Sequence, residues 1–402
     1  MKKKINICIA TAADYEYVVV LLVSILMNKK IETEICFHFL VSNDFTDEAR
    51  VCLESLCLEH GCKCCFYSVG NQFDKATTHI PWISTPTFYR LIIPEVLEKE
   101  DKCLYLDADI VVMEDLWELY NADISDYMVA GVYALAYQKV LNSEEYCKSA
   151  ELPGIDNYIN AGVLLMNLKA LREKEFSRKA MELIPKDYPS QDQDIVNKLC
   201  YRHIKILPFK YNCMTKYYHW NEYDYEDLYK RDEILESWAR PVIIHYADRK
   251  KPWKDFSSPL AQKWWYFCKK SPAWDYWRET AESEFVYRSL FDSKKNCGLC
   301  DIYKIKQWDN VIVFGAGNVS KKIIWELKKI GIIVDSVIVS KKENNPESIN
   351  GIVVKAVSEI DDGKKRLPVI LAVQNDFRAE VISFLWENDF INIYMIEENG
   401  LI

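Results

Sequence analysis

The chain has 402 residues, of which half are hydrophobic, and it carries a formal net charge of −9. This length predicts about two or three domains. The apolar content excludes a disordered chain, and the acidic balance argues against wholesale binding of nucleic acid. No apolar run is long enough to span a bilayer, and the basic residues 2–4 lead into a short strand without the features of a signal peptide. We therefore expect a cytoplasmic protein whose 14 cysteines are reduced thiols.

The first seventy residues alternate between predicted strands and predicted helices. The predicted strands are residues 5–10, 35–41 and 64–68, and the predicted helices are residues 17–27 and 44–59. This rhythm predicts a doubly wound α/β sheet. Ligands bind such sheets at the carboxyl ends of the strands, so the loop from Thr11 to Asp14 is a candidate binding loop.

The stretch 102–116 contains the strongest local signal. A buried strand at residues 103–106 is followed by Asp107 and Asp109. Two carboxylates one residue apart repel each other unless a positive charge lies between them. A divalent cation with oxygen ligands supplies that charge. An isolated Asp-x-Asp is often only a solvated strand end, but the buried strand before this one favours a metal site that holds a diphosphate.

Three further positions have both a structural and a functional interpretation. Arg90, on a predicted helix at residues 84–97, points either at the Asp-x-Asp site or at solvent. Asn160, before a predicted strand that ends at residue 167, either bonds a sugar hydroxyl or closes a turn. Ser190 is the predicted N-cap of a helix whose first turn carries Asp192 and Asp194, and such a helix end either caps itself or offers groups to a ligand.

His245 ends a predicted strand at residues 240–246. It is either a satisfied polar residue or the nitrogen ligand that completes the two-Asp site, with Lys251 neutralising phosphate. The aromatic segment 260–287 is interpreted as a helical lid or connector. The alternative for this segment is peripheral attachment to a membrane.

A second α/β unit is predicted from residue 309. Its strands are residues 311–314, 333–339 and 369–373, and a helix covers residues 376–387. The turn after the first strand contains Gly315 and Gly317, with Ser320 in place of a third glycine and Asp335 about where a ribose-binding acid is expected. This turn is a candidate second nucleotide site, although similar turns often only pack. Cys297 and Cys300 form a single CxxC, which would suit half of a zinc site or a redox pair, but no second pair at metal spacing appears, and this favours coincidence.

Four motifs in this order carry a resemblance to a known family. They are Leu106-Asp107-Ala108-Asp109, Asn160-Ala161-Gly162-Val163, Gln191-Asp192-Gln193-Asp194, and His245 with Lys251-Pro252-Trp253. Through them, residues 5 to about 265 resemble glycosyltransferase family 8, which includes glycogenin and bacterial lipopolysaccharide galactosyl- and glucosyltransferases. The resemblance implies a GT-A fold and retaining transfer of a hexose from UDP-glucose or UDP-galactose to a hydroxyl on a glycan or lipid-linked acceptor, at the inner face of the membrane or elsewhere in the cytoplasm.

The resemblance also implies roles for individual residues. Asp107, Asp109 and His245 would bind Mn²⁺, with Mg²⁺ as the alternative, and Lys251 would hold the diphosphate. The donor sugar would contact Arg90, Asn160 and Asp192, and Gln193 would lie near the anomeric carbon, with Asp192 as the fallback nucleophile. Thr11 and its neighbours would line the nucleoside pocket.

Two departures from the family pattern concern the donor site. Ala12 stands where relatives carry an acid for the uracil, so Asp14 or the main chain would replace that contact. Asp248 stands where a glycine often contacts phosphate, so its side chain would have to turn outwards.

The domain prediction is a GT-A domain at residues 1–260, an aromatic connector at 261–304 and a Rossmann-like accessory domain at 305–402. Other functions remain open at this stage. They are a nucleotide-cofactor oxidoreductase or epimerase using Gly315 and Gly317, a glycogenin-like self-glucosylating protein, and a scaffold built on an inactive transferase fold.

Overall fold

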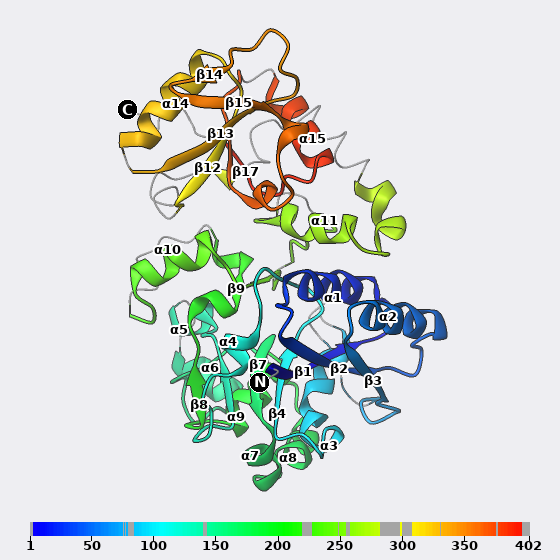
Figure 1. Cartoon of the computed structure of the whole chain (residues 1–402). Coiled ribbons are helices and arrows are strands. Elements are labelled where there is room, and N and C mark those ends of the chain that lie inside the picture. The colour runs from blue at the N-terminus through cyan, green and yellow to red at the C-terminus, as the bar shows by residue number, and fades with distance from the viewer. Residues whose placement is uncertain are drawn as a thin grey trace. The chain divides into compact units, whose positions relative to one another are not determined.

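A computed structural model of the chain describes residues 3–74, 76, 78, 84–139, 143–218, 227–247, 249–254, 258–281, 298–299, 308–329, 331–374 and 377–395. The chain separates into two compact units. The first comprises Met1–Arg249 with Ser271–Ala273, and the second comprises Lys250–Lys270 with Trp274–Ile402. Each unit contains its own seven-stranded sheet (Figure 1).

The sheet of the first unit has the strand order β3-β2-β1-β4-β7-β6-β8. Strands β1 to β4 run parallel, and β7 is antiparallel to both of its neighbours. The strands are β1 (Lys3–Thr11), β2 (Thr33–Val41), β3 (Lys63–Ser68), β4 (Lys102–Leu106), β6 (Val129–Gly131), β7 (Val163–Asn167) and β8 (Ile204–Ile206). The three predicted N-terminal strands are therefore confirmed, and β4 delivers Asp107 and Asp109 at the carboxyl end of a central strand, as the Asp-x-Asp pattern predicts.

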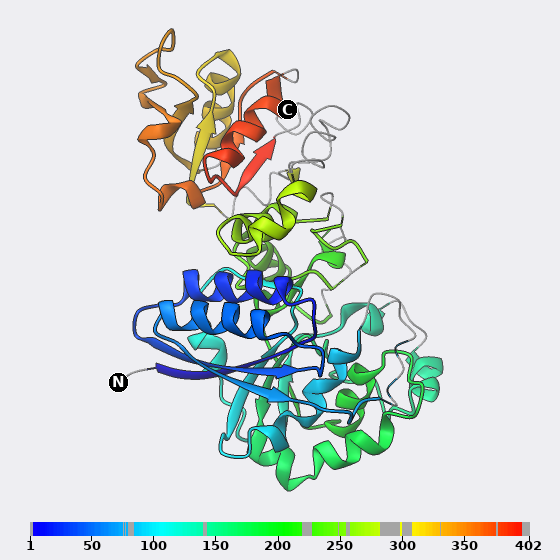
Figure 2. The ribbon, with the colours of Figure 1, turned by 90° about the vertical axis from the view of Figure 1, so that its right-hand side faces the viewer.

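Helices cover both faces of this sheet. Helices α1 (Glu16–Asn28) and α2 (Asp47–Glu59) lie side by side on one face of β1, β2 and β3 (Figures 1 and 2). Helix α1 buries Ser24, and Thr46 caps α2 by accepting a hydrogen bond from the Ala49 N–H. The opposite face packs against η1 (Thr85–Ile92), α3 (Ile93–Val96), α7 (Leu168–Glu173), α8 (Phe176–Leu183) and α9 (Asp192–Leu199).

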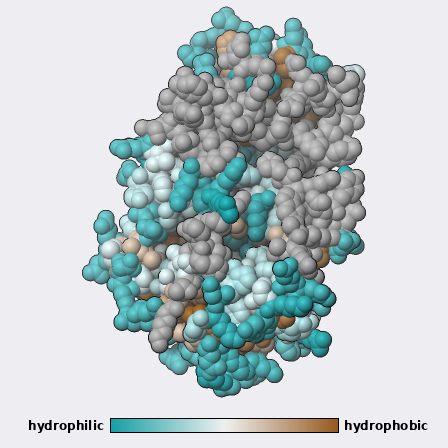
Figure 3. Space-filling view, turned by 180° about the vertical axis from the view of Figure 1, so that it is seen from behind, coloured by the Kyte–Doolittle hydropathy of each residue, from teal (hydrophilic) through white to brown (hydrophobic). Residues whose placement is uncertain are grey.

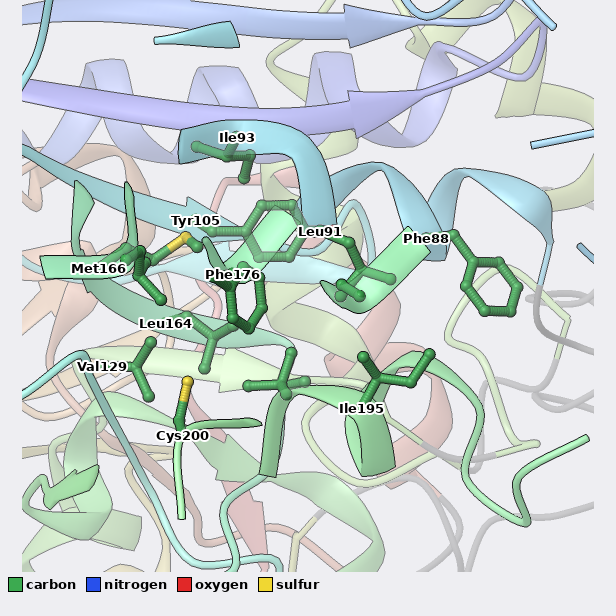
Figure 4. Close-up of a cluster of buried hydrophobic side chains, with 14 of the residues drawn as sticks. Phe88, Leu91, Ile93, Tyr105, Val129, Leu164, Met166, Phe176, Ile195 and Cys200 are labelled. Atoms are coloured by element: carbon green, nitrogen blue, oxygen red, sulfur yellow. The ribbon is translucent and has the colours of Figure 1, made fainter. Parts of the chain in front are cut away.

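The side chains between this second helical layer and the sheet form the main core beneath the predicted site. Leu91 of η1 lies near Tyr105 of β4, Leu164 of β7 and Phe176 of α8, and Phe88 of η1 belongs to the same buried cluster (Figure 4). All are buried, and together they fix the position of η1 relative to the end of β4. Because Arg90 lies on η1 between these anchors, its direction is set by the packing.

Two local predictions in this layer are wrong. Residues 84–97 do not form one α-helix but a 3₁₀ helix followed by the short α3, and Pro94 cannot continue an α-helical ladder. Ser190 is not the N-cap of α9. That position belongs to Gln191 at a φ of 52°, while the Ser190 side chain accepts a hydrogen bond from Tyr146.

A small second sheet brings distant parts of the first unit together. It contains β5 (Ile110–Val112), β9 (Cys213–Met214) and β10 (Ile243–His245), in the order β5-β10-β9. In the antiparallel pair of β10 with β5, His245 lies opposite Ile110. The remaining elements of the unit are α4 (Trp117–Tyr120), α5 (Leu135–Lys139), α6 (Ser143–Ser149), η2 (Phe209–Tyr211), η3 (Thr215–Tyr217) and α10 (Arg231–Ala239).

The sheet of the second unit has the order β11-β17-β16-β12-β13-β15-β14 and is parallel apart from β14. Its strands are β11 (Gly298–Leu299), β12 (Asn310–Phe314), β13 (Ile333–Val339), β14 (Ser348–Ile349), β15 (Ile352–Ala356), β16 (Val369–Leu371) and β17 (Ile393–Met395). Its described helices include α14 (Asn318–Lys329), α15 (Arg378–Glu387), η5 (Val357–Glu359) and η6 (Lys364–Arg366). The predicted α/β unit after residue 309 is therefore present.

The predicted aromatic connector begins with α11 (Ala261–Lys269), which belongs to the second unit. Within that unit Trp274 packs on Trp386, and Lys270 forms a 2.6 Å ion pair with Asp389. Trp264 and Trp265 of α11 are buried. Cys297 and Cys300 lie outside the described residues.

Among the described residues, no helix combines the length and the apolar character needed to cross a bilayer. On the face in Figure 3, hydrophilic residues cover most of the coloured surface, and apolar residues are scattered between them. Peripheral contact with a membrane stays a prediction.

Candidate active site

The centre of the candidate site is the crossing from β4 to β5. Backbone hydrogen bonds hold this crossing on both sides: the Asp107 N–H donates to the Gly162 carbonyl at 2.9 Å, and the Tyr246 N–H donates to the Asp109 carbonyl at 3.0 Å. His245 is the last residue of β10 and is buried. The site thus joins strand ends that are far apart in the sequence.

Asp107, Asp109 and His245 form a compact set of metal-ligand atoms. One carboxylate oxygen from each Asp and one ring nitrogen of His245 all lie within 4.8 Å of one another. The His245 Nε2 atom is 3.1 Å from Asp109 Oδ1 and 3.8 Å from Asp107 Oδ2. Two carboxylates and one imidazole suit a divalent ion such as Mn²⁺. These residues therefore fit the predicted metal centre.

The other nitrogen of His245 is held by Asn212. His245 Nδ1 lies 2.9 Å from Asn212 Oδ1, and Asn212 Nδ2 donates to Asn160 Oδ1 at 2.9 Å. Because the amide nitrogen of Asn212 is committed to Asn160, its oxygen faces the ring, and we assign the imidazole proton to Nδ1. This leaves the Nε2 lone pair directed at the two carboxylates, the arrangement that orients metal-binding histidines in proteins.

Gly162 is required for this arrangement. A Cβ atom at this position would lie 2.2 Å from His245 Cε1 and 2.6 Å from Asp107 Oδ2. Any side chain would therefore displace two of the three ligands. Gly162 belongs to the second motif of the family resemblance, and its role is to leave room beside the ligands.

Arg90 lies between two acidic positions of the site and is buried. Its Nη2 donates to Asp107 Oδ1 at 2.8 Å, its Nε lies 3.0 Å from Asp192 Oδ2, and its Nη1 donates to the Ala161 carbonyl. Burial acts to lower the pKa of Arg90, but the charges of Asp107 and Asp192 outweigh it and raise that pKa. The structure thus places Arg90 at the site and makes it the permanent counter-charge to both acids.

Asp192 is buried at the start of α9. Thr87 donates to its Oδ1 at 2.8 Å, while Arg90 pairs with its Oδ2. Burial raises the pKa of Asp192 to about 6, with Arg90 and Thr87 opposing that rise. At neutral pH the carboxylate is therefore mostly ionised, its Oδ1 accepts the hydrogen bond from Thr87, and its Oδ2 is held by the ion pair with Arg90.

Gln193 is held on three sides. Its Oε1 accepts from Asn160 Nδ2 at 3.0 Å and from the Ala161 N–H at 3.2 Å, and its Nε2 donates to the Tyr158 hydroxyl at 3.1 Å. Tyr158 in turn donates to Asp194 Oδ1 at 2.5 Å. Burial raises the pKa of Asp194, with the hydrogen bonds from Tyr158 and Ser190 opposing that rise. This buried network fixes the Gln193 amide beside the ligand triad.

For the other predicted donor-site residues, the structure gives a position in the chain and a degree of exposure. Thr11 is buried at the carboxyl end of β1, and Asp14 is exposed in the following loop. Lys251 is buried and belongs to the second unit, so its role at a diphosphate stays a prediction. Asp248 lies outside the described residues.

The predicted second nucleotide site is only partly assembled. The Ser320 hydroxyl donates to the Gly315 carbonyl at 2.6 Å and closes the turn after β12. Gly315, at a φ of 112°, allows close packing, since a Cβ there would lie 2.8 Å from the Ala372 carbonyl oxygen, whereas a Cβ on Gly317 would meet nothing within 4 Å. Asp335 stands at an irregularity beside Val311 and Ile312, near the start of β13, and pairs with Lys364 at 2.7 Å. The structure therefore does not bring Asp335 to the glycine turn, which follows the opposite end of β12.

Sequence reasoning missed four residues that complete the site. Thr87 bridges Arg90 and Asp192, and Tyr105 donates to Asp107 Oδ1 at 2.7 Å. Asn212 orients His245, and Gly162 makes room for the ligands. Tyr105, two residues before Asp107, and Gly162, inside a recognised motif, could have been found from position alone. The role of Asn212 depends on β9 pairing with β10, and no local pattern reveals it.

Comparison with known proteins agrees with this geometry. The profile of Glycosyl transferase family 8 matches residues 6–257. A putative glycosyltransferase of Haemophilus influenzae is 28% identical over 254 residues, covering 62% of this chain and 73% of that protein. A lipopolysaccharide 1,2-glucosyltransferase of Escherichia coli is 30% identical over 242 residues, covering 58% of this chain and 68% of that protein.

The fold comparison leads to the same family. The galactosyltransferase LgtC, solved in complex with donor and acceptor sugar analogues, superposes with a TM-score of 0.56 at 25% identity. The match covers 67% of this chain and 99% of LgtC. Other relatives are longer, and this chain spans only 30% of one from Streptococcus gordonii. The first unit has the GT-A type of α/β fold, and the chain belongs to glycosyltransferase family 8.

Proposed function

We propose that the chain is a metal-dependent retaining hexosyltransferase that moves glucose or galactose from a UDP-sugar to a hydroxyl of a glycan or lipid-linked saccharide. The observation that carries this proposal is the Asp107–Asp109–His245 set at the end of β4, with Asp192 and Gln193 beside it. The names of the relatives support a glucosyl or galactosyl donor. The acceptor class rests on the lipopolysaccharide relative.

The metal centre is proposed to hold Mn²⁺, with Mg²⁺ as the alternative. Asp107, Asp109 and His245 would bind the ion, which supplies charge stabilisation to the departing diphosphate. Asn212 holds the imidazole ring of His245 so that its Nε2 atom points at the ligand position. Arg90 donates a hydrogen bond to Asp107 Oδ1 and so holds this carboxylate in position, while Asp107 Oδ2 lies on the side of His245.

Asp192 and Gln193 are proposed to contact the reacting hexose. Gln193 is a neutral amide whose oxygen already accepts two hydrogen bonds, which makes it a poor nucleophile. Both oxygens of Asp192 are engaged by Thr87 and Arg90, which favours a binding role for this carboxylate. We therefore favour attack by the acceptor on the face from which UDP leaves, with the departing phosphate taking the acceptor proton. Asp192 as a covalent nucleophile is the second route.

The donor is tested by thermal-shift measurements on the full chain with UDP-glucose, UDP-galactose and UDP, each with and without Mn²⁺. We expect the melting temperature to rise only when nucleotide and ion are both present, because the diphosphate and the carboxylates share the ion. UDP release is then followed against candidate saccharide acceptors. A chain that is stabilised equally by nucleotide in the presence of a chelator would contradict the metal assignment.

The remaining alternatives are tested in the same preparation. A cofactor-dependent oxidoreductase or epimerase would quench or enhance NADH fluorescence on binding. A self-glucosylating protein would gain hexose mass increments on its own tyrosines after incubation with donor alone. An inactive scaffold would release no UDP with any acceptor or with water.

A further inference from the structure

Three sulfur and nitrogen donors gather at the β2–β3 edge of the first sheet, away from the Asp107 site. Cys36 and His38 are two residues apart on β2, so their side chains point to the same face. Cys65 lies directly opposite His38 in the parallel register of β2 with β3. One ligand atom from each of the three residues lies within 4.8 Å of the other two.

This donor set has the chemistry of a zinc site. Two thiolates and one imidazole match the sulfur and nitrogen ligands that Zn²⁺ takes in proteins, at about 2.3 Å and about 2.0 Å respectively. Tetrahedral coordination at these lengths places ligand atoms roughly 3.5–3.8 Å apart, so the present separation needs only small side-chain adjustments. The set differs from the oxygen-rich Asp107 site, since thiolates select softer ions than Mn²⁺ or Mg²⁺.

The ring of His38 is already oriented by a chain of hydrogen bonds. His38 Nε2 lies 3.3 Å from Asn6 Oδ1, and Asn6 Nδ2 donates to Glu100 Oε2 at 2.7 Å. The amide nitrogen is thus committed to Glu100, so we assign the ring proton to Nε2. Metal-binding histidines in proteins donate their second N–H in this way.

The lone pair of His38 Nδ1 then faces β3. It lies 3.1 Å from the hydroxyl of Tyr67, which shares a face of β3 with Cys65. Tyr67 would give up this hydrogen bond to a bound ion.

The position is open to ions in solution. Cys65 is exposed and Cys36 half-buried. The α2 helix covers the other face of the sheet, where its Cys57 contacts Cys64.

We propose that Cys36, His38 and Cys65 form a second metal site, specific for Zn²⁺ or a similarly soft ion, with water as the fourth ligand. The ion would join the edge strand β3 to β2 and add stability to that edge. The site is independent of donor-sugar binding.

The test uses the full chain, stripped with a chelator and titrated with Co²⁺ as a spectroscopic substitute for Zn²⁺. We expect a thiolate-to-cobalt charge-transfer band that saturates at one ion per chain and disappears when Zn²⁺ is added. Cys36→Ser and Cys65→Ser should each weaken binding by at least about 100-fold, and Asn6→Ala by about 10- to 100-fold through loss of ring orientation. Circular dichroism checks that each variant is folded.

Matched controls separate this site from the first one. Cys52→Ser and Cys147→Ser should keep the band, and Asp109→Ala should keep it while losing Mn²⁺ binding. In case the ligand variants fail to fold, Zn²⁺ should also slow alkylation of Cys36 and Cys65 in the unmodified chain and leave Cys52 unaffected. Absence of the band, its persistence in both ligand variants, or a Cys36–Cys65 disulfide detected by mass in freshly reduced and desalted protein would overturn the proposal.

Discussion

The two units contain similar parallel sheets but use the carboxyl ends of their strands differently. In the first unit, β4 ends at two aspartates that meet His245 and Arg90. In the second, β12 ends at a glycine turn closed by Ser320, and the nearest predicted acid, Asp335, pairs with Lys364 near the other end of its strand. Both sheets offer a binding position by topology, but among the described residues it is the first that brings two carboxylates and an imidazole together within 4.8 Å.

This difference shows that the fold alone does not assign a ligand. The first site is held together by charges of opposite sign and by a glycine that leaves space between them. In the glycine turn of the second unit, the Ser320 hydroxyl donates to the Gly315 carbonyl, and Gly315 packs closely against Ala372. A functional assignment therefore has to come from the site residues.

The strongest test of this contrast is removal of a ligand. Asp109→Ala leaves only Asp107 and His245 as ligands. The loss of several kcal/mol of transition-state stabilisation should lower the rate of Mn²⁺-dependent UDP release about a thousandfold. Steady-state UDP release measures this. Asp101→Ala is the matched control, because Asp101 is a largely exposed acid just before the same strand. Wild-type turnover in the ligand variant would remove Asp109 from the site.

A glycine exchange compares the two units directly. Gly162→Ala would drive a methyl group into His245 and Asp107, so we expect Mn²⁺ affinity to fall by at least about 100-fold. Gly317→Ala in the second unit meets open space and should leave affinity and UDP release unchanged. Calorimetric titration with Mn²⁺ measures both variants. Equal losses in the two would show that the turn of the second unit takes part in the reaction.

Orientation of His245 by Asn212 should have a smaller effect. Asn212→Ala keeps all three ligands but frees the imidazole ring, and we expect a loss of about 10- to 100-fold in Mn²⁺ affinity. High Mn²⁺ should restore turnover, which distinguishes this positioning role from a direct one. Asn345→Ala, on the exposed surface of the second unit, is the control. A variant with unchanged affinity would show that the ring needs no such partner.

The pH profile should report Asp192. Its pKa of about 6 means that the Asp192–Arg90 pair weakens as the carboxylate takes up a proton below that pH, so activity should fall on the acid side. Thr87→Val removes a hydrogen bond that favours the ionised form and should move this acid limb to higher pH. The profile of kcat/KM at saturating Mn²⁺ measures the shift. An unmoved limb would assign the titration to another group.

Substitution of Lys263, in the second unit, should have the smallest effect on activity. We expect it to change the stability of that unit instead. Burial lowers the pKa of Lys263 to about 7, and Arg366 acts in the same direction. The unfolded chain then binds more protons between about pH 7 and pH 10, so the free energy of unfolding of this unit should rise with pH across that window. Lys263→Met should remove this dependence and raise the melting temperature near pH 7.

Scanning calorimetry of the full chain across this pH window tests the Lys263 prediction. Lys321→Met, on the exposed side of α14, should leave the pH dependence unchanged. UDP release should be the same in both variants. A pH dependence that persists in Lys263→Met would assign it to another group of the unit.

Several features of this protein were readable from the sequence because they are local. Short apolar runs that alternate with segments of helical periodicity predicted both α/β units. A buried run followed by Asp107 and Asp109 predicted a central strand with two carboxylates at its carboxyl end. The failures were also local: the sequence of residues 84–97 shows helical spacing, but Pro94 and packing against the core favour a 3₁₀ helix. Ser190 has the residue type of an N-cap, but its hydroxyl instead forms hydrogen bonds with Tyr137 and Tyr146.

Only the tertiary structure decided how the ligands meet. Asn212 reaches His245 because β9 pairs with β10, and Arg90 reaches both Asp107 and Asp192 because the core fixes η1 against β4. The Cys36–His38–Cys65 cluster likewise depends on the register between two strands. Strand order and register are set by the packing of whole layers, so contacts between residues distant in the chain leave no local pattern in the sequence.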